Sequence, residues 1–338
     1  MRDMAQATGI SISTLCWALK TGIMKRRSSR LKLLLTDANK RERLAFCGAQ
    51  VTSPMTPSTS TLLLMIPKAL MCAASAGTLR EVAFCGMWDV VHLDEKWFNA
   101  DKHCRKEYLV DDETPGTRSC KSKRFLPKVM FLRAVARPRQ SLGFDRKIEL
   151  WPFVNQTPAL RACRNRPAGT MVSKTTNVEA ETFRDYVLNK VVPAIKAKFP
   201  SISKCVSLQH DNATPHSSID DKALAKQPPN SPDLNVLDLG FFAPIQTLQY
   251  KMFSRSVDDV IASTMVAFDT LEADTLENVF LTLQAVMRLA LEQSGGNLFK
   301  LPHLNKAAMR HAGNLVVNLT CPVSLLFEAN GLLQTMSP

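Results

Sequence analysis

Residues 90–98 read Val-Val-His-Leu-Asp-Glu-Lys-Trp-Phe. The apolar run at 90–93 is rich in β-formers and predicts a buried strand, which we expect to end at Asp94. Open α/β sheets gather functional side chains at their strand ends, so Asp94 is a candidate site residue. An ordinary turn is the alternative interpretation, because aspartate favours turns. Lys96 beside it is a candidate phosphate contact or, equally, half of a solvated charge pair with Glu95.

Two further aspartates lie in comparable settings. Asp211 follows an apolar stretch at 204–209 that predicts a second strand. Asp238 follows a loop dense in proline and asparagine, near the start of a predicted helix, and Asp233 in that loop has the alternative role of a helix cap. Carboxylates that are far apart in sequence suit a shared Mg²⁺ site, since hard cations prefer oxygen ligands. Two such ions about 4 Å apart can bind the attacking and leaving oxygens of a phosphodiester displacement.

The rest of the pattern predicts a sheet covered by helices. Three further segments read as strands: 107–110, 128–136 and 147–153. Five segments read as helices: 179–198, 217–226, 235–250, 257–271 and 276–292. The first of these helices is expected to kink at Pro193. Strands followed by a helix, another strand and then mostly helices indicate an α/β fold with a mixed sheet.

Composition narrows the class of protein. The chain has 338 residues, which allows about two domains. Its formal net charge of +13 favours a polyanionic partner such as nucleic acid, although a basic protein with another role is the alternative. The nine cysteines include no Cys-x-x-Cys pair, which argues against a zinc site or a disulfide framework and favours reduced thiols in an intracellular compartment. We recognise no signal peptide, and the apolar stretch at 62–76 is too short and too interrupted to span a bilayer.

The N-terminal residues carry a helix-turn-helix pattern. Gly9 suits the turn between two helices, and Ser11 or Ser13 can cap the second helix. That helix would present four side chains to a DNA groove: Ser13, Thr14, Trp17 and Lys20. A basic segment follows and reads as an arm on phosphates or in a minor groove: Lys25, Arg26, Arg27 and Arg30. Any short helical hairpin is the alternative interpretation.

Three phrases of this sequence resemble the mariner superfamily of DDE/D transposases. Asp94 begins Asp-Glu-Lys-Trp-Phe, which is similar to the phrase around the first catalytic aspartate of that family. Asp211 lies in Gln-His-Asp-Asn-Ala, with His216 following, which is similar to the second phrase. Ser-Pro-Asp-Leu-Asn at 231–235 is similar to the third, and Asp238 occupies the position of the glutamate that many members use.

The resemblance covers most of 2–47 and 86–320, and parts of it are similar to the lineage in oomycetes and related eukaryotes. It implies a ribonuclease-H-like catalytic domain behind a DNA-binding N-terminus, and cut-and-paste movement of a DNA element. On this basis Asp94, Asp211 and Asp238 are expected to be catalytic and to bind two Mg²⁺ or Mn²⁺ ions. The expected partners are transposon ends and target DNA, with a homodimer allowed, and with neither a membrane nor a small-molecule substrate. The implied location is the nucleus.

The expected domains follow from these assignments: 1–47, a helix-turn-helix region with its basic arm; 48–85, a linker; 86–300, the DDE/D catalytic domain; and 301–338, a C-terminal tail.

Three departures from the family pattern lead to the hypothesis of a degenerate copy. The interval between Asp211 and Asp238 is short, and the strand expected within it is predicted to be missing. The linker does not resemble the usual connection, and the chain begins almost inside the helix-turn-helix, which suggests truncation there. A catalytically inactive, transposase-derived DNA-binding protein is therefore the main alternative. A different nuclease or integrase of the same fold is the second.

Overall fold

The computed structural model of the chain describes residues 8–23, 32–52, 80–101, 126–145, 147–163, 166–200, 206–211, 224–252, 254–271 and 273–335. The chain divides into two compact units, Met1–Leu34 and Leu35–Pro338. The division falls before helix α3 (Asp37–Thr52), so this helix belongs to the second unit and extends into the segment that we expected to be a linker.

The first unit contains helix α2 (Ile12–Lys20). Its start has the predicted features: Gly9 adopts a left-handed φ of 68°, and the Thr14 amide donates to Ser11 Oγ at 3.1 Å. Leu15 of this helix is buried. The segment expected to form the first helix of the hairpin, 2–7, and the basic arm at 25–30 lie outside the described residues.

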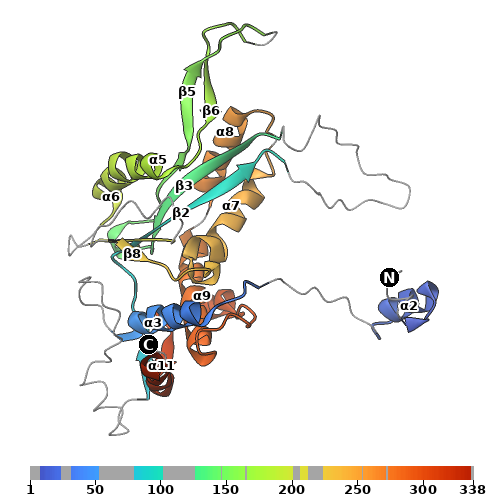
Figure 1. Cartoon of the computed structure of the whole chain (residues 1–338), viewed down its shortest axis with the longest axis vertical. Helices are drawn as coiled ribbons and strands as arrows, with labels where there is room; N and C mark the ends of the chain where they lie inside the picture. The colour runs from blue at the N-terminus through green and yellow to red at the C-terminus, as the bar shows by residue number, and fades with distance from the viewer. Residues whose placement is uncertain are drawn as a thin grey trace. The chain divides into compact units, whose positions relative to one another are not determined.

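The second unit is built on a mixed sheet whose described strands run in the order β4-β3-β2-β7-β8. These strands are β2 (Val90–Asn99), β3 (Lys128–Ala136), β4 (Lys147–Pro152), β7 (Ser207–His210) and β8 (Leu224–Lys226). Strand β3 pairs antiparallel with β2 and β4, whereas β7 pairs parallel with β2 and β8. The predicted mixed sheet is confirmed, and Figure 1 shows it in the middle of this unit.

Two of the strand predictions were wrong. Strand β2 does not end at Asp94 but continues to Asn99, because β3 supplies antiparallel partners from Val91 to Asn99. The strand expected to be missing between Asp211 and Asp238 is present as β8, where we had predicted a helix at 217–226. Pairing with β7 overrides the helical propensity of the local alanine, leucine and lysine residues. The strand predicted at 107–110 lies outside the described residues.

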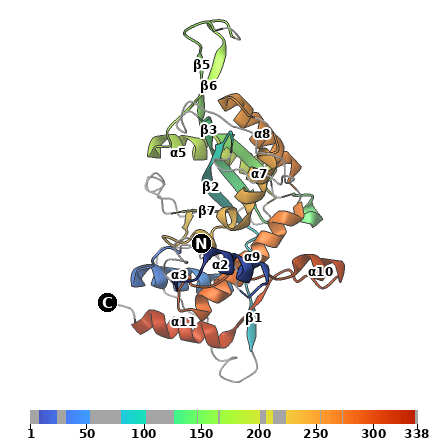
Figure 2. The ribbon, with the colours of Figure 1, turned by 90° about the vertical axis from the view of Figure 1, so that its right-hand side faces the viewer.

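Helices cover both faces of the sheet, and the alternation of side chains along the strands explains why. On one face, Phe98 and Phe131 pack with Phe242 of α7 (Phe242–Gln249) and with helices α8 (Val257–Thr270) and α9 (Ala273–Glu292). On the other face, Leu93 and Leu132 form a second core with α5 (Ala180–Tyr186) and α6 (Val192–Lys198). Figures 1 and 2 show α5 on the side opposite α7 and α8.

The helix predicted at 179–198 is confirmed, and a π-helical turn interrupts it near Pro193, where we expected a kink. A π-helical turn, η3 (Val187–Val191), separates α5 from α6, and Pro193 lies at the start of α6. Proline has no amide hydrogen to donate to the preceding turn, so a wider turn at this point relieves the clash with its ring. The helices predicted at 257–271 and 276–292 are also confirmed, as α8 and α9.

Smaller elements complete the unit. Strand β1 (Glu81–Ala83) pairs with β9 (Thr320–Pro322), and the hairpin of β5 (Val154–Pro158) and β6 (Met171–Thr175) extends beyond the main sheet, as Figure 2 shows. Helices α10 (Lys306–His311) and α11 (Val323–Thr335) follow near the C-terminus. Within the described residues, none of the helices combines the length and the apolar character that crossing a bilayer requires.

Candidate active site

Sheet register brings Asp94 and Asp211 to the same end of two neighbouring parallel strands. Strand β7 pairs with β2 only along Val90–His92, where His92 lies opposite Gln209. Asp94 and Asp211 each follow this last pair by two residues, and residues two apart on a strand share a face. Asp94 is therefore not at the end of its own strand, but it lies where β2 continues beyond its parallel neighbour.

Asp238 reaches the same region from a different element. The segment Ser231–Asn235 forms a short turn that includes the 3₁₀ turn η5 (Pro232–Leu234), and the π-helical turn η6 (Leu237–Phe241) follows it. Asp238 lies in the first turn of η6. Leu234 and Leu237 are fully buried, so the apolar side chains of this segment fix its position against the sheet.

The Asp94 carboxylate is buried, with 8% of its surface exposed, and it has defined hydrogen-bond donors. Asn235 Nδ2 donates to Oδ2 at 2.8 Å, and the Glu95 amide donates to Oδ1 at 2.8 Å. Burial and, in decreasing order, the charges of Asp238, Glu95 and Asp211 together raise the pKa of Asp94 to about 8, while the hydrogen bond from the Glu95 amide lowers it. Removal from water and like charge both disfavour the ionised form of a carboxyl group.

Asp238 is coupled to the same charges. Loss of solvation raises the pKa of Asp238, the Lys96 ammonium lowers it, and Asp211 raises it. The residue is nevertheless surface-exposed, so water still screens part of these effects. Because Asp94, Asp211 and Asp238 act on one another electrostatically, we refer to these three residues as the acidic cluster.

The acidic cluster is not a preformed ligand set. Within the described ranges, no group of three or more histidine, cysteine, aspartate or glutamate side chains is close enough to hold a metal ion. The neighbouring His92 is fully buried against Phe280, and burial lowers the pKa of His92 to about 3, so it is neutral. His216, which forms part of the second phrase, lies outside the described residues.

A second polar contact involves Asp233, five residues before Asp238, and was not predicted. Asp233 does not cap a helix through its side chain. Instead both of its oxygens accept from Arg43 of α3, through Nη1 and Nη2 at 2.7 Å each. Arg43 is fully buried, and its Nε also donates to the Gly295 carbonyl at 2.8 Å. We call this contact the Arg43 ion pair. It ties α3 to the turn at 231–235 and to the residues that follow α9.

Asn235 is the other functional candidate that we missed. It has only 4% of its surface exposed, and its side chain bridges Asp94 and the amide of Leu237. The Ser-Pro-Asp-Leu-Asn phrase contains it, but nothing in the phrase indicates that its amide reaches a strand 141 positions away. Only the folded chain reveals that contact.

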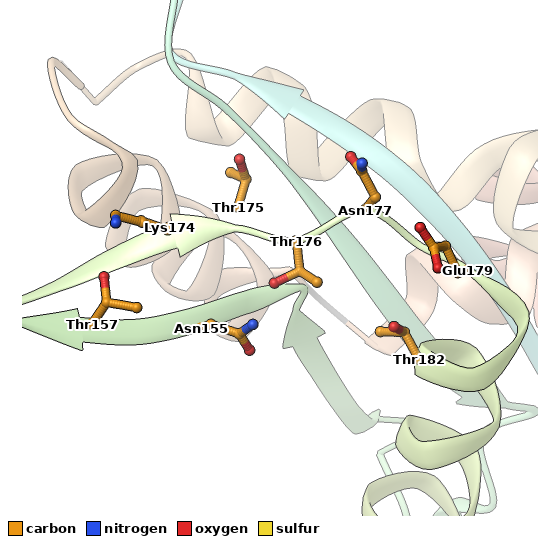
Figure 3. A pocket seen from close by; sticks show the side chains of 8 residues that line it. All are labelled: Asn155, Thr157, Lys174, Thr175, Thr176, Asn177, Glu179 and Thr182. Atoms are coloured by element: carbon orange, nitrogen blue, oxygen red, sulfur yellow. The ribbon is translucent and has the colours of Figure 1, made fainter.

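A polar cavity of about 440 Å³ lies apart from the acidic cluster, at the base of the β5–β6 hairpin. Figure 3 shows its lining, which comes from β5, β6, the segment before α5 and the first turn of α5: Asn155, Thr157, Lys174, Thr175, Thr176, Asn177, Glu179 and Thr182. None of the predicted site residues contributes to this lining. The cavity therefore adds no chemistry to the acidic cluster.

The predicted DNA-contacting side chains of α2 share the solvent-facing side of that helix. Ser13, Thr14, Trp17 and Lys20 are all exposed, and Trp17 has 58% of its surface accessible. The hydroxyls of Ser13 and Thr14 both lie 2.8 Å from Ser11 Oγ. The four arm residues predicted with them lie outside the described residues: Lys25, Arg26, Arg27 and Arg30.

The fold is similar to solved structures of Mos1 transposase. A pre-cleavage Mos1 transpososome matches with a TM-score of 0.57 and 16% sequence identity, covering 88% of this chain and 75% of that chain. The Mos1 paired-end complex with the left transposon end gives 0.54 and 15%, and the mariner Mos1 paired-end complex with Mg gives 0.55 and 16%, each with the same coverage of both chains. No protein-family model and no curated protein matches the sequence. The comparison shows that this chain has a fold similar to that of Mos1 mariner transposase.

Proposed function

We propose that this chain is a DNA transposase that cleaves and joins phosphodiester bonds in a metal-dependent, cut-and-paste reaction. The supporting observation is the acidic cluster, which lies at one end of the central sheet in a fold similar to that of a transposase. Burial and like charge hold the pKa of Asp94 near 8, so ionising all three acids at neutral pH is unfavourable without a compensating positive charge. A divalent cation would supply that charge.

The donor set fits Mg²⁺ or Mn²⁺. All three members of the cluster are carboxylates, the hard oxygen ligands that these ions prefer. When bound, such ions would activate a water for strand cleavage and stabilise the leaving 3′ oxygen. The residues of the chain would bind and orient the ions. Asp94 is held by its hydrogen bonds, and the three carboxylates together would have to converge, because they are not all at shared ligand distance.

DNA binding forms the second part of the proposal. The chain carries a net charge of +13, and neutralised phosphates release condensed counterions, which favours association with DNA. The exposed side chains Ser13, Thr14, Trp17 and Lys20 on α2 form a surface that would enter a groove. Transposon ends and target DNA are the proposed substrates, and a homodimer would hold two ends together.

The test is a plasmid nicking assay with the purified chain in Mg²⁺ or Mn²⁺. We expect Asp94→Asn to lower the cleavage rate about 10³-fold, because losing a cation ligand removes several kcal/mol of charge stabilisation in the transition state. Asp269→Asn is the matched control, since Asp269 is exposed on α8 and is not among the charges that shift the pKa of Asp94 or Asp238. Cleavage that does not need a divalent cation, or that Asp94→Asn leaves unchanged, would contradict the proposal.

One observation favours a second candidate function, a catalytically inactive DNA-binding protein. The described side chains of the acidic cluster are not gathered at ligand distance. If the cluster does not close around a cation, the chain will still bind DNA through its basic N-terminal region. Sequence-specific binding that survives Asp94→Asn, without nicking by the wild type, would support this alternative over the transposase.

A further inference from the structure

Asn235 connects two members of the acidic cluster through a single buried side chain. Its Nδ2 donates to Asp94 Oδ2 at 2.8 Å, and its Oδ1 accepts from the Leu237 amide at 2.8 Å. Leu237 is the first residue of η6 and directly precedes Asp238. The same amide group therefore contacts the strand that carries one acid and the turn that carries another.

The backbone around Asn235 leaves it little freedom. The Asn235 amide donates to the Pro232 carbonyl at 3.3 Å, and its carbonyl accepts from the Leu239 amide at 2.8 Å. The preceding turn is held in addition by the Arg43 ion pair through Asp233. When hydrogen bonds hold both the backbone and the side-chain amide of a residue, that residue can hold the groups it contacts in a defined position.

We propose that Asn235 is a positioning residue, which holds the Asp94 carboxylate against the turn that carries Asp238 and so sets the separation of these two acids before a cation binds. The inference rests on the proposed function, because it concerns the same acids. An amide donor favours the ionised form of a carboxylate and fixes its rotamer, as outer-shell partners of metal ligands commonly do. Asparagine combines this donor with an acceptor of the right length for the Leu237 amide, whereas the shorter serine hydroxyl could accept from that amide but could not also reach Asp94.

A helix-start role alone would be the competing explanation. The bond from the Leu237 amide resembles that of an ordinary cap, and serine is about as good as asparagine at such a position. Asn235→Ser therefore separates the two roles: it keeps an acceptor for the backbone but is too short to reach Asp94. Asn235→Ala removes both contacts.

The experiment measures Mn²⁺ affinity of the purified full chain by electron paramagnetic resonance, without DNA. We expect Asn235→Ser and Asn235→Ala to weaken Mn²⁺ binding by about 10- to 100-fold, the range found for outer-shell partners of metal sites. Asn189→Ser is the matched control, because Asn189 also donates to an aspartate, Asp185, at 2.7 Å but on an exposed helix surface. Wild-type affinity in Asn235→Ser, with loss only in Asn235→Ala, would reduce the residue to a cap and overturn the inference.

A second readout needs no cation and separates this inference from the proposed function. In EDTA, we expect the side-chain amide protons of Asn235 to exchange with solvent more slowly than those of Asn189, and Asp94→Ala to remove that protection, as followed by NMR. If the wild type binds no Mn²⁺ while this protection holds, the transposase proposal fails and the Asn235–Asp94 contact stands. If the side-chain amide protons of Asn235 are not protected in the wild type, or if Asp94→Ala leaves their protection unchanged, the inference is overturned whether or not the chain binds Mn²⁺.

Discussion

The segment 231–238 contributes one aspartate to each of two polar groups that differ in their balance of charge. Asp233 belongs to the Arg43 ion pair, where two carboxylate oxygens meet a buried guanidinium. Asp238 belongs to the acidic cluster, where neighbouring carboxylates raise one another's pKa and Lys96 is the cation that lowers the pKa of Asp238. Two acids of one short segment thus have opposite electrostatic environments.

The difference separates a structural role from a functional one. A buried ion pair with matched charges and further hydrogen bonds needs nothing from outside the protein, and its loss leaves a buried charge without compensation. A cluster of like charges is unfavourable by itself and is relieved only by protons or cations. Strongly perturbed carboxyl groups of this kind are enriched at functional sites. The same segment therefore secures the fold at one aspartate and serves the proposed chemistry at the other.

The largest effect is expected from breaking the Arg43 ion pair. Arg43→Ala should lower the free energy of unfolding by about 3–5 kcal/mol, because it leaves the Asp233 carboxylate partly buried without its partner. Arg288→Ala is the control, since Arg288 forms an exposed pair with Glu292 and should cost at most about 0.5 kcal/mol. Urea unfolding measures both. Equal losses in the two variants would show that the Arg43 ion pair has no special structural role.

The next prediction replaces an aspartate by asparagine in each group, Asp94 in the acidic cluster and Asp233 in the Arg43 ion pair. The two changes should affect the stability of the chain in opposite directions. The pKa of Asp94 is raised from 3.8 to about 8 on folding, so the wild type should lose stability as pH rises through this interval in EDTA. The loss between about pH 5 and pH 8 should be on the order of 2–3 kcal/mol, and Asp94→Asn should flatten it. Added Mg²⁺ should restore stability to the wild type at the higher pH, since a ligand that binds only the folded state stabilises it.

Asp233→Asn should behave in the opposite way. It removes the charge that matches Arg43, so it should destabilise the chain at about pH 8, and Mg²⁺ should not change the difference from the wild type. Urea midpoints at the two pH values, with and without Mg²⁺, give the comparison for all three proteins. If the stability of the wild type depends on pH no more strongly than the stability of Asp94→Asn does, the raised pKa of Asp94 is contradicted.

Local sequence patterns predicted the elements whose own residues favour the secondary structure that they adopt. The segment 128–136 was expected to be a strand from its β-forming residues and is observed as β3 over the same residues. The continuation of β2 past Asp94 and the existence of β8 depend on pairing partners, which local propensity does not contain. For the same reason a helix was predicted where β8 lies.

The same distinction between local sequence and distant partners applies to the candidate site. The three acids were identified from their phrases, and the structure brings them into one electrostatically coupled cluster, while their catalytic role stays a prediction. Arg43 and Asn235 were missed, because their partners lie 190 and 141 positions away in the sequence. Arg43 lies in a segment rich in charged residues, and nothing in the local sequence distinguishes it from neighbours such as Arg41.

A smaller effect is expected at Gly295, whose carbonyl accepts from Arg43. This glycine has a φ of 83°, and a Cβ atom added there would lie 2.2 Å from the Lys40 carbonyl oxygen. Gly295→Ala should therefore cost about 2 kcal/mol in unfolding free energy, from left-handed strain together with the displacement of α3. Gly313→Ala is the control, because Gly313 has a similar φ of 69° with open space around it, and it should cost about 1 kcal/mol. Equal costs would mean that the approach of α3 at Gly295 is readily adjusted.

The smallest effect concerns Lys96, the cation that opposes the charge imbalance of the acidic cluster. Its ammonium lowers the pKa of Asp238, so Lys96→Met should raise that pKa and leave less carboxylate available to a cation. We expect Mn²⁺ affinity to fall about threefold at about pH 6, roughly 0.7 kcal/mol. At higher pH the difference should shrink or reverse, because more of Asp238 is then ionised in both proteins and Lys96→Met carries no ammonium to repel the incoming ion. If Lys96 instead serves only as a phosphate contact, Lys96→Met will leave Mn²⁺ binding unchanged at both pH values and weaken DNA binding alone. The pH dependence of one substitution thus decides whether Lys96 acts on the acids of the cluster or on the substrate.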